Sequence, residues 1–357
     1  MSLLILGAKP TNTGGVESVI YNLNKNIVRH GFKITTLYMP YCYNKLFWSL
    51  KPVWSIQPFL RSTNLKFDLV HGHGDNCFFY SAFRRKNIPL VVTFHGTQRA
   101  SLPNVGYKNQ MLLTYLSMPE KVAADACDVA IACSKGVKDE LVSLYNIPSA
   151  KIQVIYNGVD TAKFRPTQKD YARDKLGLIK NVFYGLWIGK EVGRKGLGTA
   201  ITACRKANCV LLVAGVTGES SDSVKYLGKL SDDLMPILYN AANFFIYPSK
   251  YEGHPIVCLE ALSCGLPLIV SQNSKVEIIK EGSEGFVIPS FSDCNLYAEK
   301  IVYLLKNRRR LDEMANNARI IAEKFSWSIQ TEKYLKIYKE LMHVDLQSYR
   351  KGYPLGR

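Results

Sequence analysis

NFFIYPSKYEGHPIVCLEALSCG, residues 243–265, is the most informative stretch about the fold, because its pattern predicts a buried strand followed by a buried helix. Its first part, NFFIYPS (243–249), is a short run of aromatic and branched residues, as expected of a strand covered on both faces. Pro255 suits the first position of a helix, and Gly265 suits its end. A strand that leads through a loop into a helix is the repeating unit of α/β proteins.

Two glutamates stand eight positions apart in this stretch. Glu252 falls in the loop after the strand, and Glu260 falls inside the helix, which is otherwise apolar on nearly every side. A carboxylate within a helix that is covered all round is destabilising unless it is hydrogen-bonded or paired. We therefore expect either a neighbouring side chain or a ligand to satisfy Glu260.

The same alternation continues in both directions along the 357 residues. Strand-like runs in the first half are LLILGA (3–8), KITTLYM (33–39), FDLVHGH (67–73), LVVTFHG (90–96), DVAIACS (128–134) and IQVIYNG (152–158). Those in the second half are VFYGLWIG (182–189), VLLVAG (210–215), VKYL (224–227), NFFIYPS (243–249), PLIVS (267–271) and GFVIP (285–289). Helical patterns fit between many of them. The pattern predicts an α/β protein of two Rossmann-like domains with mainly parallel sheets.

The domain boundaries follow from composition. The polar segment 161–181 predicts the junction, so we expect one domain over residues 1–165 and a second over residues 166–326. FSWSIQTEKYLKIYKELM (325–342) has the pattern of a terminal helix, and we expect residues 327–357 to cross back to the first domain. In open α/β sheets, ligands bind beyond the carboxyl ends of the strands.

Composition excludes some classes of protein. Hydrophobic residues make up 47% of the chain, which argues against disorder, and no apolar run reaches 18 residues. The first residues show no signal peptide, so we expect a cytoplasmic protein. The net charge is +17, and residues 1–121 hold 14 Lys and Arg against 4 Asp and Glu. Such an excess of positive charge suits an anionic membrane, nucleic acid or a phosphorylated ligand, and the charge alone does not distinguish among these three partners.

Three loops at predicted strand ends carry the polar residues. KPTNTGGVES (9–18) places Gly14 and Gly15 before a helix, where backbone N–H groups can approach an anion. WIGKEVGRKGLG (187–198) brings together three cations, Lys190, Arg194 and Lys195. The third is the stretch 251–265, which carries Glu252 in its loop and Glu260 in the helix that follows. Two loops suited to anions and one with carboxylates suggest a ligand that has both phosphates and hydroxyl groups, as a nucleotide sugar does.

These residues also resemble a known family, the retaining glycosyltransferases of family 4, which includes sucrose synthases and phosphatidylinositol mannosyltransferases and has the GT-B fold. Glu252 and Glu260 match its E-x7-E motif within PS-x-x-E-G-x-P-x-x-x-x-E-A. The other matching segments occur in the family's order: YNGVD (156–160), GRKG (193–196), LLVAG (211–215) and YLGKLSDDLMPILYNAANFFIYPS (226–249). The resemblance covers roughly residues 3–340 and implies two Rossmann-like domains that face each other across a cleft.

The resemblance implies that the second domain binds the donor. Glu260 is similar to the residue that holds the donor ribose hydroxyls, and Glu252 to the carboxylate beside the donor hexose. The backbone of Gly253, His254, Pro255 and Ile256 would line the sugar. Lys195 matches the lysine that binds the diphosphate, and Lys190 stands where the family usually has arginine. Lysine keeps the charge but loses the two-pronged hydrogen bonding of a guanidinium group.

In the first domain, Gly14 and Gly15 match the loop near the transferred sugar, and His95 resembles a histidine that reaches that sugar. The implied activity, which serves glycan biosynthesis, is transfer of a hexose from a UDP- or GDP-linked donor to a hydroxyl of a glycan or lipid-linked acceptor, with retention of configuration. The catalytic residues would be His95, Glu252 and Lys195. Cationic side chains would stabilise the departing diphosphate, so we expect no metal and no cofactor.

The acceptor is expected at the first domain, where the positive charge lies. YCYNKLFWSLKPVWSIQPFLRS (41–62) interleaves basic residues with tryptophans, which suits an anionic membrane surface or an acceptor mouth. The residues concerned are Lys45, Trp48, Lys51, Trp54 and Arg61. We therefore expect peripheral attachment to the inner face of the membrane as one option and a packed insertion as the other.

The sequence leaves two alternatives open. A nucleotide-sugar epimerase of the same fold would share the architecture but not the glutamate motif. A nucleic-acid-binding protein would explain the charge, although the sequence lacks the usual recognition motifs and we expect no nucleic-acid partner.

Overall fold

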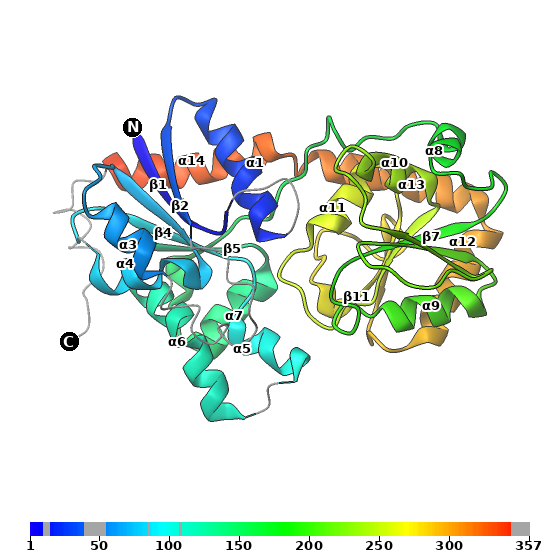
Figure 1. Ribbon diagram of the computed structural model, residues 1–357, viewed down its shortest axis with the longest axis horizontal. Helices are drawn as coiled ribbons and strands as arrows, with labels where there is room; N and C mark the ends of the chain where they lie inside the picture. The colour runs from blue at the N-terminus through cyan, green and yellow to red at the C-terminus, as the bar shows by residue number, and fades with distance from the viewer. Residues whose placement is uncertain (10–14, 39–54, 85, 107–108, 344–357) are drawn as a thin grey trace. The chain divides into compact units, whose positions relative to one another are not determined.

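The structure is a computed structural model that describes residues 1–9, 15–38, 55–84, 86–106 and 109–343. The chain forms two compact units (Figure 1). Unit 1 contains Met1–Tyr156 and Trp327–Arg357, and unit 2 contains Asn157–Ser326. Unit 2 is thus one continuous segment inserted between the two parts of unit 1.

Unit 1 is built around a parallel sheet with the strand order β2-β1-β3-β4-β5-β6. The strands are β1 (Ser2–Gly7), β2 (Lys33–Tyr38), β3 (Leu69–His73), β4 (Leu90–Phe94), β5 (Val129–Ala132) and β6 (Ile152–Val154). Its helices are α1 (Val16–Val28), α3 (Ile56–Ser62), α4 (Phe78–Phe83), α5 (Gln98–Ser101), α6 (Gln110–Ala126), α7 (Lys135–Tyr145) and α14 (Trp327–His343). Short 3-10 turns are η2 (Gly74–Cys77), η3 (Leu102–Val105) and η4 (Ser149–Lys151).

Unit 2 repeats this plan with the parallel order β12-β11-β10-β7-β8-β9. The strands are β7 (Tyr184–Ile188), β8 (Val210–Ala214), β9 (Val224–Gly228), β10 (Phe244–Tyr247), β11 (Leu268–Ser271) and β12 (Gly285–Ile288). Its helices are α8 (Lys169–Lys175), α9 (Leu197–Lys206), α10 (Met235–Ala241), α11 (Ile256–Ser263), α12 (Cys294–Lys306) and α13 (Arg308–Glu323), with the 3-10 turn η5 (Gln272–Ser274).

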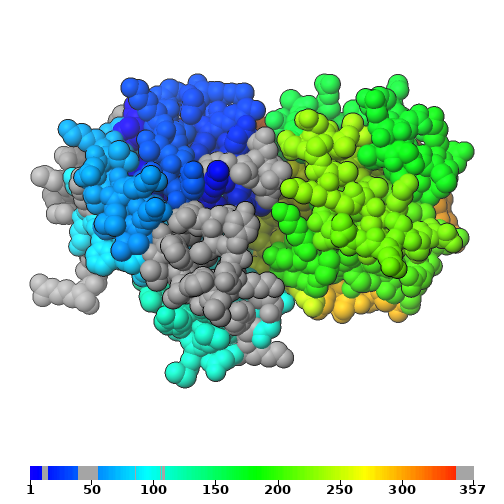
Figure 2. Space-filling model, in the orientation of Figure 1, coloured from blue at the N-terminus to red at the C-terminus, as the bar shows by residue number. Residues whose placement is uncertain are grey.

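Helices cover both faces of each sheet, as parallel sheets require. In unit 2, α9 packs with α12, and α11 packs with α13 on the opposite side of the sheet (Figure 1). The face of unit 2 that Figure 2 shows is formed mainly by its green and yellow-green segments, and the orange of α12 and α13 appears only at its margin. Together the two sheets confirm the predicted α/β class with two Rossmann-like domains.

The strand order of each sheet reverses at one place. In unit 1 the chain moves from β1 to β2 on one side and then continues from β3 on the other. In unit 2 the same reversal separates β7 from β10. At such a reversal the loops after the two central strands diverge to opposite faces of the sheet and leave a crevice, which is where α/β proteins bind ligands.

The last helix belongs to unit 1. Helix α14 packs against α1, and the Tyr338 hydroxyl lies 2.7 Å from Nδ1 of His71 on β3. Phe32 also meets Tyr338 edge to face, with ring centroids 6.3 Å apart. Among the described residues, no helix is both long enough and apolar enough to cross a membrane.

Candidate functional site

Two loops of unit 2 leave its sheet at the reversal. The first, residues 189–196, follows β7, and the second, residues 248–255, follows β10. Because β7 and β10 are hydrogen-bonded neighbours that run in parallel, both loops start from the same edge of the sheet. The cationic loop that the sequence singled out therefore starts beside the loop that carries Glu252, and Arg194 and Glu252 are in contact.

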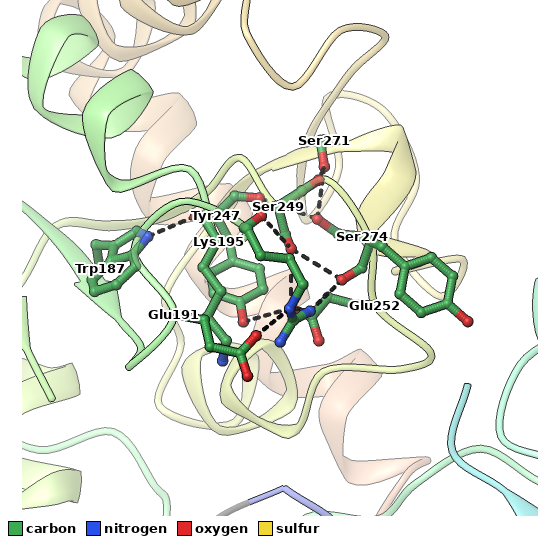
Figure 3. Close-up of polar contacts among 10 residues, drawn as sticks. Trp187, Glu191, Lys195, Tyr247, Ser249, Glu252, Ser271 and Ser274 are labelled. Carbon is green, nitrogen blue, oxygen red and sulfur yellow. Dashed lines mark hydrogen bonds and ion pairs between the residues drawn. The ribbon is translucent and has the colours of Figure 1, made fainter. Parts of the chain in front are cut away.

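Glu252 is held at one oxygen by three donors. Its Oε1 accepts hydrogen bonds from Arg194 Nη1 at 2.9 Å, from the Tyr247 hydroxyl at 3.0 Å and from the Ser249 hydroxyl at 3.0 Å. Figure 3 shows Tyr247 and Ser249 converging on the carboxylate. Oε2 receives no hydrogen bond from any residue in the described part of the chain. One oxygen of Glu252 is thus an anchor, and the other is available to a ligand.

Arg194 joins the two loops. Besides Glu252, its guanidinium group contacts the carboxylate of Glu191 and the carbonyl oxygen of Tyr251. Its own carbonyl oxygen accepts a hydrogen bond from the Lys250 N–H at 2.8 Å. The arginine and glutamate side chains are only 17% and 13% exposed, so their ion pair is well shielded from solvent. Coulombic attraction to Glu252 and the hydrogen bond to Glu191 outweigh the effect of burial and raise the pKa of Arg194.

Glycines let the loop after β7 pack closely. At Gly196, which has φ of +66°, a Cβ would lie 2.0 Å from the carbonyl oxygen of Pro248 in the second loop. At Gly189 a Cβ would lie 2.7 Å from Cδ of Lys195. Lys195 is further held by its carbonyl oxygen, which accepts the indole N–H of Trp187 at 2.9 Å (Figure 3). Its Nζ lies 5.5 Å from the centre of the Tyr247 ring. Lys190 is exposed.

A group of buried serines supports the second loop from the side of β11. The hydroxyl of Ser271 donates to the carbonyl oxygen of Ser249 and lies 2.9 Å from the hydroxyl of Ser274 (Figure 3). Ser274 in turn donates to the carbonyl oxygen of Tyr247 at 3.1 Å. These bonds fix the backbone on both sides of Ser249, and they therefore fix the direction in which Glu252 leaves the loop.

Glu260 lies on α11, as the sequence predicts, and a neighbour satisfies one of its oxygens. The Tyr239 hydroxyl of α10 donates to Oε2 at 2.7 Å. Within the described residues, Oε1 has no hydrogen-bond partner. Burial raises the pKa of Glu260 to about 7, and the hydrogen bond from Tyr239 and the charge of Lys163 only partly oppose that rise. The unbound protein thus keeps a carboxyl group that would gain from additional donors.

The turn between the two glutamates is tightly packed. Gly253, His254 and Pro255 are buried, and Ile256 opens α11, with Pro255 as its N-cap residue rather than its first residue. The Asn157 side chain donates to the carbonyl oxygen of His254 at 2.8 Å. Burial lowers the pKa of His254 to about 3, so this ring is neutral near pH 7.

The other expected site residues lie in unit 1. His95 follows β4 and is half-buried, and its Nε2 lies 2.9 Å from Nδ1 of His73. Gly15 is the exposed N-cap of α1, and Arg61 lies exposed in the last turn of α3. The remaining expected residues, Gly14, Lys45, Trp48, Lys51 and Trp54, lie outside the described residues. Across the described parts of both units, no group of three or more His, Cys, Asp and Glu side chains could hold a metal ion.

Sequence reasoning missed the partners that position the glutamates. Tyr239 lies 21 residues before Glu260, and Arg194 lies 58 residues before Glu252. Neither separation is a helical or strand spacing, so only the tertiary fold brings these residues together. The only sequence signal for the pairing of Arg194 with Glu252 was that the two residues carry opposite charges and lie in two predicted strand-end loops.

Two family models match the chain, one in each half. The model described as Glycosyltransferase Family 4 matches residues 13–163. The model described as Glycosyl transferases group 1 matches residues 168–320. Together they cover most of the chain, and the second includes both glutamates and the cationic loop.

Two similar curated proteins carry related names. An uncharacterized glycosyltransferase of Methanocaldococcus jannaschii is 29% identical over 308 residues, which are 78% of this chain and 77% of that protein. A D-inositol 3-phosphate glycosyltransferase of Gordonia bronchialis is 27% identical over 307 residues, which are 77% of this chain and 66% of that protein.

Solved structures show the same fold. Sucrose-phosphate synthase from Thermosynechococcus elongatus superimposes with a TM-score of 0.82 at 18% identity, over 96% of this chain and 99% of that one. Anabaena HepE in complex with UDP-glucose gives a TM-score of 0.74 at 18% identity, over 95% of this chain and 100% of that one. With both halves matched by glycosyltransferase models and both sheets arranged as in these structures, the chain belongs to the family 4, group 1 type of glycosyltransferases with the GT-B fold.

Proposed function

We propose that the protein transfers a hexose from a nucleotide diphosphate sugar, UDP- or GDP-linked, to a hydroxyl of a glycan or lipid-linked acceptor, with retention of configuration. One observation carries this proposal: the loops at the reversal of the unit 2 sheet and helix α11 combine a cationic segment with two carboxylates, Glu252 and Glu260, each of which has one oxygen without a partner among the described residues. The cationic segment suits a diphosphate, and the free carboxylate oxygens suit the hydroxyl groups of a sugar.

The donor nucleotide is expected along α11 and the loop after β7. The ribose hydroxyls would donate to Oε1 of Glu260, which supplies the additional donors that this carboxyl group lacks. Lys195 and Lys190 would face the diphosphate, together with backbone N–H groups of Gly14 and Gly15. The similar HepE structure contains UDP-glucose, which supports a nucleotide sugar as the donor class. Cationic side chains can stabilise a departing diphosphate by themselves, so we propose a metal-independent reaction.

Glu252 is suited to positioning and electrostatic stabilisation of the sugar. Three hydrogen bonds spread the negative charge of Oε1 and hold the carboxylate in one orientation. That orientation presents Oε2, which can accept a sugar hydroxyl and stabilise the positive charge that develops on the ring. A held carboxylate of this kind supports front-side transfer, in which the acceptor hydroxyl attacks on the side that the diphosphate leaves. His95, Glu252 and Lys195 are the residues that we expect at the reacting atoms.

The acceptor is expected to bind unit 1. Residues 1–121 have a surplus of ten positive charges, which suits an anionic glycan or the headgroups of an anionic membrane. We propose a glycan or lipid-linked acceptor on this basis, with peripheral membrane contact where the acceptor carries a lipid.

The test is a thermal-shift titration with UDP, GDP, ADP and a panel of their sugars. A ligand at one hundred times its dissociation constant should stabilise the native protein by roughly 2.7 kcal/mol. We expect a shift with one base only, abolished in Glu260→Ala, whereas Glu252→Ala should keep the shift and lose turnover. Absence of a shift with every nucleotide sugar would refute the donor assignment, and an unchanged shift in Glu260→Ala would refute the ribose contact.

A further inference from the structure

Three histidines line the carboxyl ends of two neighbouring strands in unit 1. His71 and His73 lie on β3, and His95 follows β4, which pairs with β3. The rings of His71 and His73 have centroids 4.4 Å apart, and those of His73 and His95 are nearly parallel with centroids 5.2 Å apart. His73 therefore lies between the other two, at the reversal of the unit 1 sheet.

Both ring nitrogens of His71 are hydrogen-bonded, so the ring is held in one orientation beside His73. Its Nε2 lies 2.7 Å from the Thr93 hydroxyl, and its Nδ1 lies 2.7 Å from the Tyr338 hydroxyl of α14. On another side, β1 approaches His73 so closely that a Cβ on Gly7 would lie 3.3 Å from Cδ2 of the ring. His73 is 1% exposed. Its ring therefore has little freedom to turn.

His73 and His95 are joined by one hydrogen bond, in which a single proton lies between the two rings. Burial lowers the pKa of His95 to about 4 and holds that of His73 well below its ordinary value, so both rings are neutral near pH 7. A neutral imidazole has one N–H donor and one bare nitrogen. In the 2.9 Å contact between His73 Nδ1 and His95 Nε2, one ring donates and the other accepts.

Only two arrangements satisfy this contact. In the first, His73 Nδ1–H donates to Nε2 of His95, so the proton of His95 lies on Nδ1. In the second, His95 Nε2–H donates, so the proton of His73 lies on its own Nε2. The outer nitrogens, His73 Nε2 and His95 Nδ1, have no hydrogen-bond partner among the residues that the structure describes. Each arrangement thus leaves one N–H group unpaired, and the two differ in where that group lies.

The outer nitrogens of both rings are covered in the unliganded protein, but the two residues differ in overall burial. An unpaired buried N–H group is more costly and rarer than an unpaired acceptor. The second arrangement would place such a group on the almost completely buried His73, next to Gly7 and the ring of His71. The first places it on Nδ1 of His95, which belongs to the less buried of the two residues, and a bound ligand would supply the missing acceptor.

We propose that His73 is a positioning residue that holds His95 in its Nδ1–H form, so that His95 offers a hydrogen-bond donor to an oxygen of the bound ligand. That the ligand is a donor sugar rests on the proposed function. The tautomer itself rests only on the contacts among these side chains and exists in the unliganded protein. A tautomer fixed in advance removes the need to reorganise this donor when the ligand binds.

The direct test is nitrogen-15 NMR of the unliganded full-length chain with labelled histidine, because the chemical shifts of the two ring nitrogens identify the protonated one. We expect His95 in the Nδ1–H form in the native protein. His73→Asn keeps a side-chain amide that can donate to His95 Nε2 and should preserve this form. His73→Leu removes the donor and should shift His95 toward the Nε2–H form. His30→Asn, at a half-exposed surface histidine, is the matched control.

Activity provides a second readout. We expect His73→Leu to lower kcat roughly tenfold to a hundredfold, since one buried contact is lost, while the KM for the donor changes little. His73→Asn should keep most of the native kcat, which would not be expected if the ring of His73 had a purely structural role. An Nε2–H form of His95 in the native protein, or an unchanged form in a folded His73→Leu variant, would overturn the proposal. If the tautomers behave as expected but no sugar nucleotide binds, the proposed function fails and this inference stands.

Discussion

Replacing Glu260 with glutamine should make the unliganded protein more stable, and it should remove the additional stability that the donor gives to the native protein. The substitution keeps the shape of the side chain and an oxygen that can accept the Tyr239 hydroxyl, and it removes the ionisation. Burial raises the pKa of Glu260 to about 7, against 4.5 for an ordinary glutamate. Between these two pH values the folded protein holds a proton that the unfolded chain has released, so the free energy of unfolding decreases as pH rises.

The size of the effect follows from the pKa difference. One pKa unit corresponds to about 1.4 kcal/mol, so the shift from 4.5 to about 7 corresponds to about 3 kcal/mol, lost in full above pH 7. This is an upper value, because Glu260 is not completely buried. At pH 8 the Glu260→Gln variant should therefore exceed the native protein by up to about 3 kcal/mol, and at pH 4.5 the two should be nearly equal. In a unit of this size the difference is roughly 6 to 12 °C in Tm.

The assay is thermal unfolding from pH 4.5 to 8.5, with and without the nucleotide sugar that stabilises the native protein. The exposed Glu299→Gln on α12 is the matched control and should show no pH-dependent difference. Added donor should stabilise the native protein but not the Glu260→Gln variant. A variant that is less stable than the native protein at pH 8, or a difference that does not vary with pH, would refute the reasoning about the buried carboxyl group.

Three further outcomes are expected. Arg194→Met should lower the free energy of unfolding by about 2 kcal/mol and reduce turnover, because it leaves Glu252 without its charged partner. Equal midpoints of the variant and the native protein in a urea titration would contradict this. Gly196→Ala should destabilise unit 2 by more than about 1 kcal/mol, since its Cβ would meet the Pro248 carbonyl, whereas Gly198→Ala, where nothing lies within 4 Å, should be neutral or stabilising in the same urea titration. Transferase activity should persist after dialysis against EDTA, and a loss that added Mg²⁺ or Mn²⁺ restores would disprove metal independence.

The sequence predicted the fold well because its signals were local. A buried parallel strand is typically a continuous apolar run, and each of the twelve strands of the two sheets overlaps a predicted strand segment, although β2 and β9 contain polar residues and are only partly buried. Helix ends were less well placed. Pro255 was expected inside the helix and lies at its N-cap, one residue earlier, where its fixed φ serves equally well.

The site was only partly predictable, because its residues are positioned by contacts distant in sequence. The two glutamates stand out in sequence as charges among apolar residues. The hydroxyls and guanidinium group that orient them come from β10, α10 and the loop after β7, at separations that follow from the strand order. Position in the sheet likewise decides the roles of the two histidines on β3. Both stand in one glycine-containing segment, yet His71 is fully paired and His73 is not.

The discontinuity of unit 1 affects how the protein is made. During synthesis, every residue of unit 2 leaves the ribosome before α14, although unit 2 is second in the chain. The first sheet is translated early but must wait for the last helix to cover α1 and to bring Tyr338 to His71. Until then, apolar side chains such as Phe32 lack part of their cover, and a nascent chain stopped after residue 326 would expose them to chaperones and proteases.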